Sequence, residues 1–255
     1  MRSNVWKREE LIVALNLYWK VPYNKISGSS NSLIKDVAQI IGRTPAALAY
    51  KLMNFTSLDS ERQFKGNKGK SGIGKLDLVI WNEYLNEWEK LAGDSAEILS
   101  HYANKDKGYS TSLEDEILYT GFEKERIVRT RINQADFRAR ILASYNEKCC
   151  ITGIDIPTLL VASHIIPWSK NHNERLNPKN GLCLNSIHDK AFDKGLITID
   201  ENFCVKLSPI ILKNHKDPSI QNFFIRYCNQ KITLPDRYIP DVNFLDWHYH
   251  NIFQK

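Results

Sequence analysis

The sequence has no apolar run of the length needed to cross a lipid bilayer. A membrane-spanning helix takes about 18 or more consecutive apolar residues, and no window of this chain reaches that length. The basic N-terminus, MRSNVWKREE, is also not followed by the apolar stretch of a secretory signal. These absences predict a cytoplasmic protein that does not interact with membranes.

Paired cysteines are absent as well. The chain has five cysteines, an odd number, and no two of them form a CxxC pair. A disulfide framework and a four-thiolate zinc site both use paired cysteines, so we expect buried, reduced thiols and no structural zinc. The five are Cys149, Cys150, Cys183, Cys204 and Cys228.

The net charge is small, and its distribution along the chain is more informative than its size. The net charge is +6; residues 1–92 carry 14 basic and 9 acidic side chains, residues 93–127 carry 4 and 8, and residues 128–255 carry 17 and 12. Two basic modules joined by an acidic connector suit a polyanionic partner, although so small an excess is also common in proteins that never meet nucleic acid. A chain of this length has room for two domains. We therefore expect a helical module at 1–92, an acidic linker at 93–127 and a second domain at 128–255.

Apolar residues recur at helical spacing in the first module. A first helix is expected after a Ser3–Asn4 cap and before Pro22, and a second over residues 32–41. Thr44 can cap a third helix that has Pro45 at its first position, because proline has no amide hydrogen to lose there.

The second and third of these helices, in the string DVAQIIGRTPAALAYKLMNF, have helix-turn-helix form. On this interpretation the third helix would contact DNA, and Arg43, Thr44 and Lys51 are the candidate contacts. An ordinary pair of antiparallel helices would give the same pattern.

Residues 61–75 contain five basic residues, one acidic residue and four glycines. They predict a flexible loop that either follows a phosphate backbone or is a solvated tether without a partner. Residues 76–91 return to helical spacing, with Trp81, Leu85 and Trp88 on one face as candidate core residues.

A short helix is expected at 113–119 within the acidic linker, and another resumes near residue 127. The latter carries an apolar stripe of Phe137, Ile141 and Tyr145.

The apolar, partly β-branched run from Thr158 to Ile166 predicts a buried strand that delivers His164 near its end. Pro167 prevents further strand pairing, so this histidine can leave the sheet and point into a cleft. Imidazole titrates near neutral pH, which makes His164 a candidate general base for activating water. A lone histidine is more often structural, and only its neighbours favour catalysis.

The first of these neighbours is Asn180, which precedes Gly181 and a second predicted strand. Its side chain is expected to bridge backbone groups of the loop 167–179 and so fix the loop that presents the histidine. A common turn asparagine would do the same without a function.

A helix follows, for which Ser186 is the expected cap. Asp189 and Asp193 are four residues apart and share one face of it. Two carboxylates on one face suit a single Mg²⁺ or Mn²⁺ rather than Zn²⁺. His188 is one residue out of phase and is a candidate softer ligand of the same ion. Gly195 is the expected end of the helix, and the strings LITID and FCVKLS then predict a short hairpin.

Together the strings CITG, ASHIIPW, NGLCL and HDKAFDKG, within residues 136–200, resemble bacterial HNH (ββα-metal) endonucleases of the restriction type. The resemblance implies a general base at His164 and a structural asparagine at Asn180. It implies metal ligands at Asp189 and Asp193, nine and thirteen residues after the asparagine.

The sequence departs from this family in two places. Relatives often carry a metal-binding His or Asp before the base, where this chain has Ser163, and the paired cysteine zinc knuckles of many relatives are absent. Candidate contacts to phosphate are Arg138 on the preceding helix and Arg175 and Lys190 near the site.

The sequence thus predicts an α+β protein: a helical, helix-turn-helix-like N-terminal module followed by a ββα-metal (HNH) nuclease domain with flanking helices and a small hairpin. The expected function is metal-dependent hydrolysis of double-stranded DNA in restriction or defence, with a DNA sequence or a base modification as the recognised feature. Because one such site cuts one strand at a time, a homodimer is one way to cut both. The alternatives are a DNA-binding regulator with a degenerate nuclease fold, which Ser163 favours, and a homing-type nuclease with a long target site.

Overall fold

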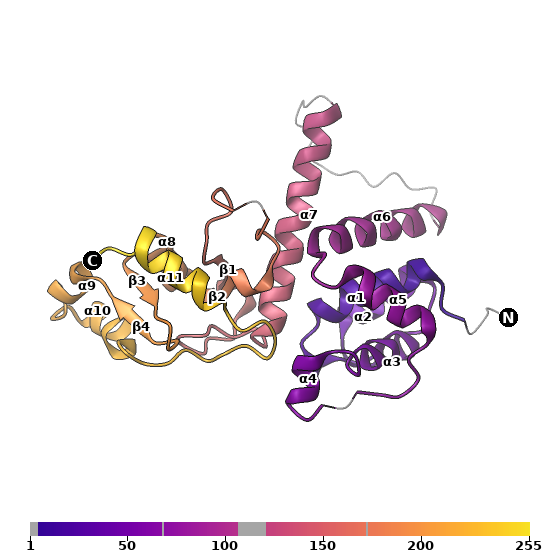
Figure 1. Ribbon diagram of the computed structural model, residues 1–255, viewed down its shortest axis with the longest axis horizontal. Coiled ribbons are helices and arrows are strands. Elements are labelled where there is room, and N and C mark those ends of the chain that lie inside the picture. Colours follow the sequence, from indigo (N-terminus) through magenta and orange to yellow (C-terminus); the bar gives the residue numbers. More distant parts are fainter. Residues whose placement is uncertain (1–4, 68, 107–120, 172) are drawn as a thin grey trace. The chain divides into compact units, whose positions relative to one another are not determined.

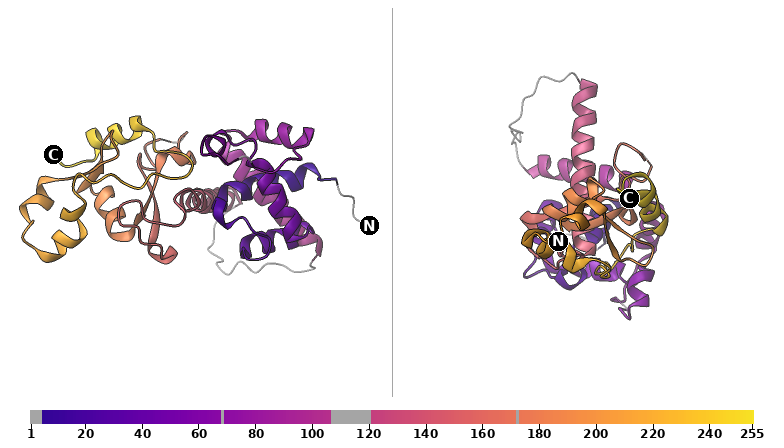
Figure 2. Two further views of the ribbon diagram at one scale, coloured as in Figure 1. Left: turned by 90° about the horizontal axis from the view of Figure 1, so that it is seen from below. Right: turned by 90° about the vertical axis from the view of Figure 1, so that its left-hand side faces the viewer.

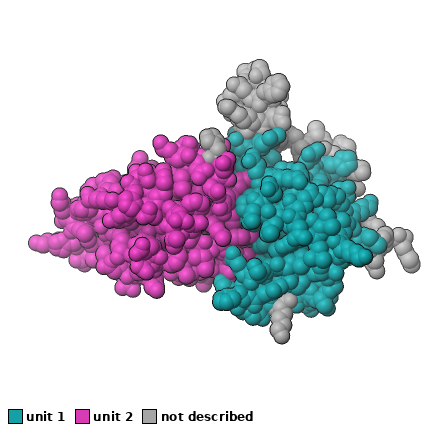
Figure 3. Space-filling view, in the orientation of Figure 1, with its two compact units in different colours: residues 1–136 teal, residues 137–255 magenta. Residues whose placement is uncertain are grey.

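The computed structural model describes residues 5–67, 69–106, 121–171 and 173–255, with the backbone alone at 104–106 and 121–127. The chain divides into two compact units, Met1–Asp136 (unit 1) and Phe137–Lys255 (unit 2), which Figure 3 distinguishes by colour. Unit 1 is helical and unit 2 combines helices with two small hairpins (Figure 1). The α+β class expected from the sequence is therefore confirmed.

Unit 1 is built around its first helix. The elements are α1 (Arg8–Lys20), a 3₁₀ turn (Tyr23–Lys25), α2 (Ser32–Ile41), α3 (Pro45–Phe55), α4 (Ser60–Phe64), α5 (Lys75–Tyr84), α6 (Trp88–Asp106) and the first part of α7 (Gly121–Ser144). Helix α1 is buried from Glu10 to Trp19, because α3, α5 and α6 all pack against it.

The helix ends in unit 1 follow local capping rules at most positions. Asn31 accepts a hydrogen bond from the Ile34 N–H at 3.0 Å to start α2, and Gly42 ends that helix with a φ of 66°. Thr44 caps α3 as expected, by accepting from the Ala47 N–H at 3.2 Å. Helix α1 begins later than expected, at Arg8, and its expected Ser3–Asn4 cap lies outside the described residues.

The single helix expected over 76–91 is wrong. Helix α5 ends at Tyr84, and Asn86 adopts a left-handed φ of 64° before α6 begins, which a short polar side chain tolerates. The break turns Leu85 to solvent, whereas Trp81 and Trp88 pack in the core with ring centroids 5.1 and 5.7 Å from that of Trp19.

The segment expected as an acidic linker begins as helix. Residues 93–106 continue α6 within unit 1, the helix expected at 113–119 lies outside the described residues, and the boundary between the units falls inside α7. The start of α7 belongs to unit 1 because Asp136 forms an ion pair with Lys20 and accepts a hydrogen bond from Asn16 at 3.4 Å. These partners are more than 110 residues away in sequence, so no local pattern announces them.

Unit 2 contains two antiparallel hairpins. The first is β1 (Leu160–His164) with β2 (Gly181–Asn185), and the second is β3 (Ile197–Ile199) with β4 (Val205–Leu207), as the strings LITID and FCVKLS predict. Helix α8 (Ser186–Asp193) packs on β1 and β2 and completes a ββα arrangement.

Further helices complete unit 2. They are α9 (Pro209–Lys213), α10 (Pro218–Phe223), α11 (Val242–Asn251) and 3₁₀ turns at Pro157–Leu159, Pro178–Asn180 and Ile225–Tyr227. Helix α11 packs on β3, while α9 and α10 lie at the end of the unit away from the β1–β2 hairpin (Figures 1 and 2).

The C-terminal segment returns along unit 2 and bonds to it through the main chain. The N–H groups of Thr233, Asp236, Asp241 and Gln254 donate to the carbonyls of Cys150, Ser144, Lys179 and Gly195, at 2.7 to 3.1 Å. Gly195 ends α8 with a φ of 66°, and a Cβ atom there would overlap the Ile252 carbonyl oxygen. Glycine is therefore needed both for the turn and for the approach of the C-terminal segment.

The cysteines are free thiols, as expected, and Cys149, Cys150 and Cys183 are buried while Cys204 and Cys228 are partly exposed. Within the described parts of the chain, every helix is too short or too polar to span a bilayer.

Candidate active site

His164 is the last residue of β1, where its Cα pairs with Gly181. Its Nε2 lies 2.9 Å from the Arg175 carbonyl oxygen, and its ring stacks on Phe137 with centroids 3.8 Å apart and meets the Trp168 ring edge-on at 5.5 Å. A carbonyl only accepts, so Nε2 carries the proton and Nδ1 keeps its lone pair. Burial lowers the pKa of His164, partly opposed by the Arg175 carbonyl. The ring is thus held neutral, which is the form that can accept a proton.

Asn180 fastens the loop that carries the Arg175 carbonyl. Its Oδ1 accepts from the Ile166 N–H at 2.8 Å, and its Nδ2 donates to the carbonyls of Ile166 at 3.1 Å and Glu174 at 3.3 Å. The side chain is 1% exposed. The expected bridging of backbone groups is therefore present, and it joins the end of β1 to the residue next to Arg175.

Gly181 pairs with His164 on the neighbouring strand and leaves room for Phe137, on which the histidine ring stacks. A Cβ atom here would overlap the side chains of Ile141 and Phe137, although the backbone φ of −138° suits any residue. The glycine is required by the close approach of α7, and Phe137 in turn supports the His164 ring.

Replacing Gly181 by alanine should therefore displace Phe137 and lower the free energy of unfolding by about 1–3 kcal/mol, the usual effect of overpacking. Thermal or urea unfolding measures this. Gly93→Ala is the control, because the position is helical with no atom near its Cβ, and it should be neutral or stabilising. Equal stability of the two variants would show that α7 does not restrict this position.

The cap of α8 is Asn185 rather than Ser186, which corrects the sequence expectation. The Asn185 Oδ1 accepts from the N–H groups of Ile187 and His188 at 3.1 and 3.0 Å, while the Ser186 hydroxyl donates to the Leu159 carbonyl at 3.1 Å. The helix therefore starts at Ser186, one residue earlier than expected.

His188 does not reach a metal site, and the structure corrects this expectation. It is 1% exposed, with Nδ1 3.1 Å from the Asn185 Oδ1 and Nε2 2.8 Å from the Phe223 carbonyl oxygen. Its ring packs against Phe224 and Tyr227. Being one residue out of phase with the aspartates turns it into the core, where both nitrogens are engaged.

Asp189 and Asp193 lie on the outer part of α8, half-buried and exposed respectively. Burial raises the pKa of both carboxyls, and the charge of Asp193 raises that of Asp189 further. The buried Ser163 hydroxyl faces the Asp189 carboxylate and partly offsets this rise by lowering its pKa. Two neighbouring carboxylates that are harder to ionise than usual favour a bound cation.

Asp189 and Asp193 suit a metal ion that has few ligands from the protein. Among the residues that the structure describes, no three His, Cys, Asp or Glu side chains converge on a point suited to a metal. Mg²⁺ is commonly held by one or two carboxylates and several waters, so the pair on α8 meets its minimum requirement.

His164 and Ser163, whose hydroxyl faces Asp189, are consecutive residues at the end of β1. Strand alternation turns Ser163 toward α8 and His164 toward Phe137 of α7, so the two side chains leave opposite faces of the strand. Their Cα atoms are nevertheless only about 3.8 Å apart, since the residues are consecutive.

Two of the candidate phosphate contacts lie beside these groups. The Arg175 guanidinium packs over the Trp168 ring at 5.1 Å and donates from Nε to the Trp168 carbonyl at 2.9 Å. Lys190 is exposed, and its charge lowers the pKa of both Asp189 and Asp193. Both positive charges are thus placed near the end of β1 and α8.

The structure does not support Arg138 as a phosphate contact. Its two terminal nitrogens donate to the carbonyls of Leu160 at 2.7 Å and Pro157 at 3.0 Å. The guanidinium therefore fixes the entry to β1.

The predicted contacts on α3 are also not supported. The Arg43 guanidinium lies 2.6 Å from the Glu10 carboxylate and over the Trp6 ring, and buried Lys51 lies 2.9 Å from the Asp77 carboxylate. Removing either charge from its partner to reach DNA would cost several kcal/mol. Thr44 is exposed, but its hydroxyl caps the helix.

Sequence reasoning missed the groups that hold His164, namely Phe137, Trp168 and the Arg175 carbonyl. Trp168 stands four residues after the histidine in ASHIIPW, which was a usable signal. Phe137 was predicted only as a core residue, because nothing local relates it to a histidine 27 positions later.

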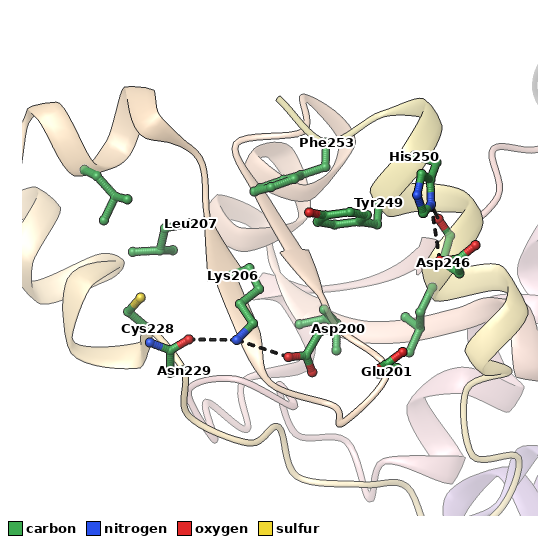
Figure 4. A pocket seen from close by; sticks show the side chains of 13 residues that line it. Asp200, Glu201, Lys206, Leu207, Cys228, Asn229, Asp246, Tyr249, His250 and Phe253 are labelled. Atoms are coloured by element: carbon green, nitrogen blue, oxygen red, sulfur yellow. Dashed lines mark hydrogen bonds and ion pairs between the residues drawn. The ribbon is translucent and has the colours of Figure 1, made fainter. Parts of the chain in front are cut away.

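A cavity of about 550 Å³ lies elsewhere in unit 2, between the β3–β4 hairpin and α11 (Figure 4). Its Lys206 ammonium bonds to Asn229 at 2.9 Å and Asp200 at 3.1 Å, beneath the stacked rings of Tyr249 and Phe253. None of the predicted site residues lines it. Carboxylates outnumber lysines along its wall, which disfavours a phosphate there.

Comparison with known proteins assigns the ββα region. Residues 149–200 match the model of the HNH endonuclease family. No curated protein shows significant similarity to the chain. The matched segment contains β1, β2, α8 and β3, and therefore His164, Asn180, Asp189 and Asp193. Residues 149–200 are thus similar to the HNH endonuclease domain, and this match supports a nuclease activity for the chain.

Proposed function

We propose that this chain is a metal-dependent endonuclease of double-stranded DNA in which His164 is the general base. The observation that carries the proposal is the state of this histidine: the Arg175 carbonyl fixes the proton on Nε2, and burial keeps the ring neutral, so that Nδ1 can take a proton from water. The position belongs to the matched HNH segment.

The reaction would be hydrolysis of one phosphodiester bond. The water oxygen would form a bond to phosphorus, one P–O ester bond would break, the water proton would go to His164 Nδ1, and the leaving oxygen would take a proton from solvent. Asn180 keeps the Arg175 carbonyl in place behind the base. Arg175 and Lys190 would bind the scissile phosphate through their positive charges.

Asp189 and Asp193 would hold one Mg²⁺ or Mn²⁺, with water in the place that Ser163 does not fill. Such an ion supplies stabilisation of the negative charge that develops on the phosphate and the leaving oxygen. The raised pKa values of both carboxyls support this assignment, since each gains from a nearby cation.

Asp189→Asn and Asp193→Asn should each abolish nicking of supercoiled plasmid in Mg²⁺ or Mn²⁺, and should weaken Mn²⁺ binding measured by electron paramagnetic resonance. Asp246→Asn is the matched control, because this carboxylate is 69% exposed on α11 of the same unit. Wild-type nicking that persists in EDTA, or full activity of both aspartate variants, would contradict the metal assignment.

A DNA-binding regulator with a degenerate nuclease fold is the second candidate, and Ser163 is the observation that favours it. It predicts tight binding of DNA without cleavage in either ion. A homing-type nuclease would instead cleave only at a long target site.

The biological role we propose is restriction or defence in the cytoplasm, with a homodimer making the double-strand cut. Digestion of plasmid and phage DNA carrying different base modifications, followed by sequencing of the ends, tests this role. Cleavage without preference for sequence or modification would argue against it.

A further inference from the structure

The basic segment after α4 is held along helix α3. The Asn54 Nδ2 donates to the carbonyls of Lys70 at 3.1 Å and Ser71 at 2.8 Å, and the Lys70 N–H donates to the Met53 carbonyl at 3.0 Å. Tyr50 adds a bond from its hydroxyl to the Ser71 carbonyl at 3.2 Å. Figure 1 shows the segment running beneath α3 toward α5. The expectation of a flexible loop is corrected, because α3 fixes this backbone.

A glycine makes this close approach possible. Gly69 has a φ of 68°, and a Cβ atom there would overlap the Ser57 backbone nitrogen. The segment therefore presents its exposed side chains from a defined backbone.

Acidic and basic side chains in this part of unit 1 point in opposite directions. Asp59 is buried, caps α4 and accepts a hydrogen bond from Tyr18, and Asp77 is buried against Lys51. In contrast, Lys65, Lys70 and Lys75 are exposed. Asp59 and Asp77 are thus bonded inside unit 1 while the three lysines face outward, which adds to the excess of basic side chains in this segment.

Two aromatic side chains accompany these lysines. Phe64, at the end of α4, is 93% exposed, and Tyr50 on α3 is 48% exposed with the Lys70 ammonium 5.7 Å above its ring. Removing exposed apolar surface from water is favourable, so Phe64 would gain by inserting into a partner. Lysines around an aromatic wedge are the combination that contacts phosphates and enters a DNA groove.

We propose that Tyr50, Phe64, Lys65, Lys70 and Lys75, the α3–α4 surface, form the site at which unit 1 binds duplex DNA. The lysines contact phosphates and Phe64 enters a groove at a base step. The inference rests on the proposed function, since it makes the substrate of unit 2 the ligand of unit 1. It assigns DNA binding to the segment beside α3 in place of Arg43 and Lys51.

The test is binding of a fluorescent duplex to the full chain, measured by anisotropy in EDTA over a range of salt concentrations. Replacing Lys65, Lys70 and Lys75 by glutamine should lower affinity at least tenfold and reduce the slope of log K against log salt by about 2–3. The control changes Lys25, Lys35 and Lys90 to glutamine, which removes the same charge from other exposed positions of unit 1.

Phe64→Ala should lower affinity roughly tenfold without changing the salt slope, as expected for loss of a contact to bases. Leu85→Ala is its control, because this side chain is also apolar and exposed, at 49%. Thermal unfolding should be unchanged in all four variants, since every altered side chain is at the surface.

Equal effects of the two lysine triples, or unchanged binding by Phe64→Ala, would overturn the proposal. Tighter, Phe64-dependent binding of single-stranded than of duplex DNA would also overturn it, in favour of base stacking. Because EDTA prevents cleavage, these results are independent of catalysis. A wild-type chain that binds through this surface but never cleaves would contradict the proposed function alone.

Discussion

His164→Ala is expected to lower the rate of DNA cleavage by about 10²- to 10⁴-fold while DNA binding and folding persist. Loss of a general base removes the acceptor for the water proton, and this range is typical of such a loss. The ring stacks on Phe137 and bonds to one carbonyl, so its removal leaves a small void with little disturbance. Single-turnover cleavage of plasmid at saturating enzyme measures the effect.

His215→Ala is the matched control, because His215 is an exposed histidine of the same unit. The wild-type pH profile gives a second measurement. Burial lowers the pKa of His164, so the neutral, active form should persist below the ordinary value of 6.5 and the rate should fall only at lower pH. A midpoint above 6.5, or an alanine variant within threefold of wild type, would rule out His164 as the base.

Asn180→Ala is expected to lower both the free energy of unfolding and the cleavage rate. The change leaves the Ile166 N–H and the carbonyls of Ile166 and Glu174 without their present partner in a buried region. Each such group costs about 1–3 kcal/mol, so a total loss of at least about 3 kcal/mol is expected. Cleavage should fall because the Arg175 carbonyl behind His164 follows Glu174 in the same loop.

Asn180→Asp tests the two donor bonds of this side chain, because the acceptor oxygen is retained. It keeps an acceptor for the Ile166 N–H but faces both carbonyls with an acceptor, so it should also be inactive. Asn177→Ala is the control. It removes a cap bond to the Lys179 N–H at 3.0 Å in the same loop, and it should cost only about 1 kcal/mol. Urea unfolding and plasmid nicking measure both variants. A stable, active Asn180→Ala variant would show that the loop 167–179 keeps its conformation without this side chain.

The parts of the structure that depend on residues close together in the chain could be predicted from the sequence. The caps of α2 and α3 and the bridging by Asn180 join groups within about fifteen residues of one another, and the β1–β2 hairpin pairs residues that are 17 to 25 positions apart. Strand alternation, capping preference and turn chemistry act over such distances, and they also placed His164 at the end of a strand.

The errors concern side chains whose partners are distant. His188 bonds to a carbonyl 35 residues away, Arg43 to a carboxylate 33 residues away and Lys51 to one 26 residues away. A histidine or lysine with a free charge and one with a buried partner look identical in the sequence. Only tertiary packing decides between a surface contact and an internal ion pair.

The shortest segment that can be moved to another protein with its fold intact depends on the main-chain bonds from Thr233, Asp236, Asp241 and Gln254. They attach to carbonyls at Cys150, Ser144, Lys179 and Gly195. Lys179 lies in the loop that precedes Asn180, and Gly195 follows the end of α8. A fusion enzyme built from residues 149–200 alone would lose every one of these donors, together with Phe137 behind His164. Transplantation of the activity onto another DNA-binding protein therefore calls for residues 137–255 as one cassette.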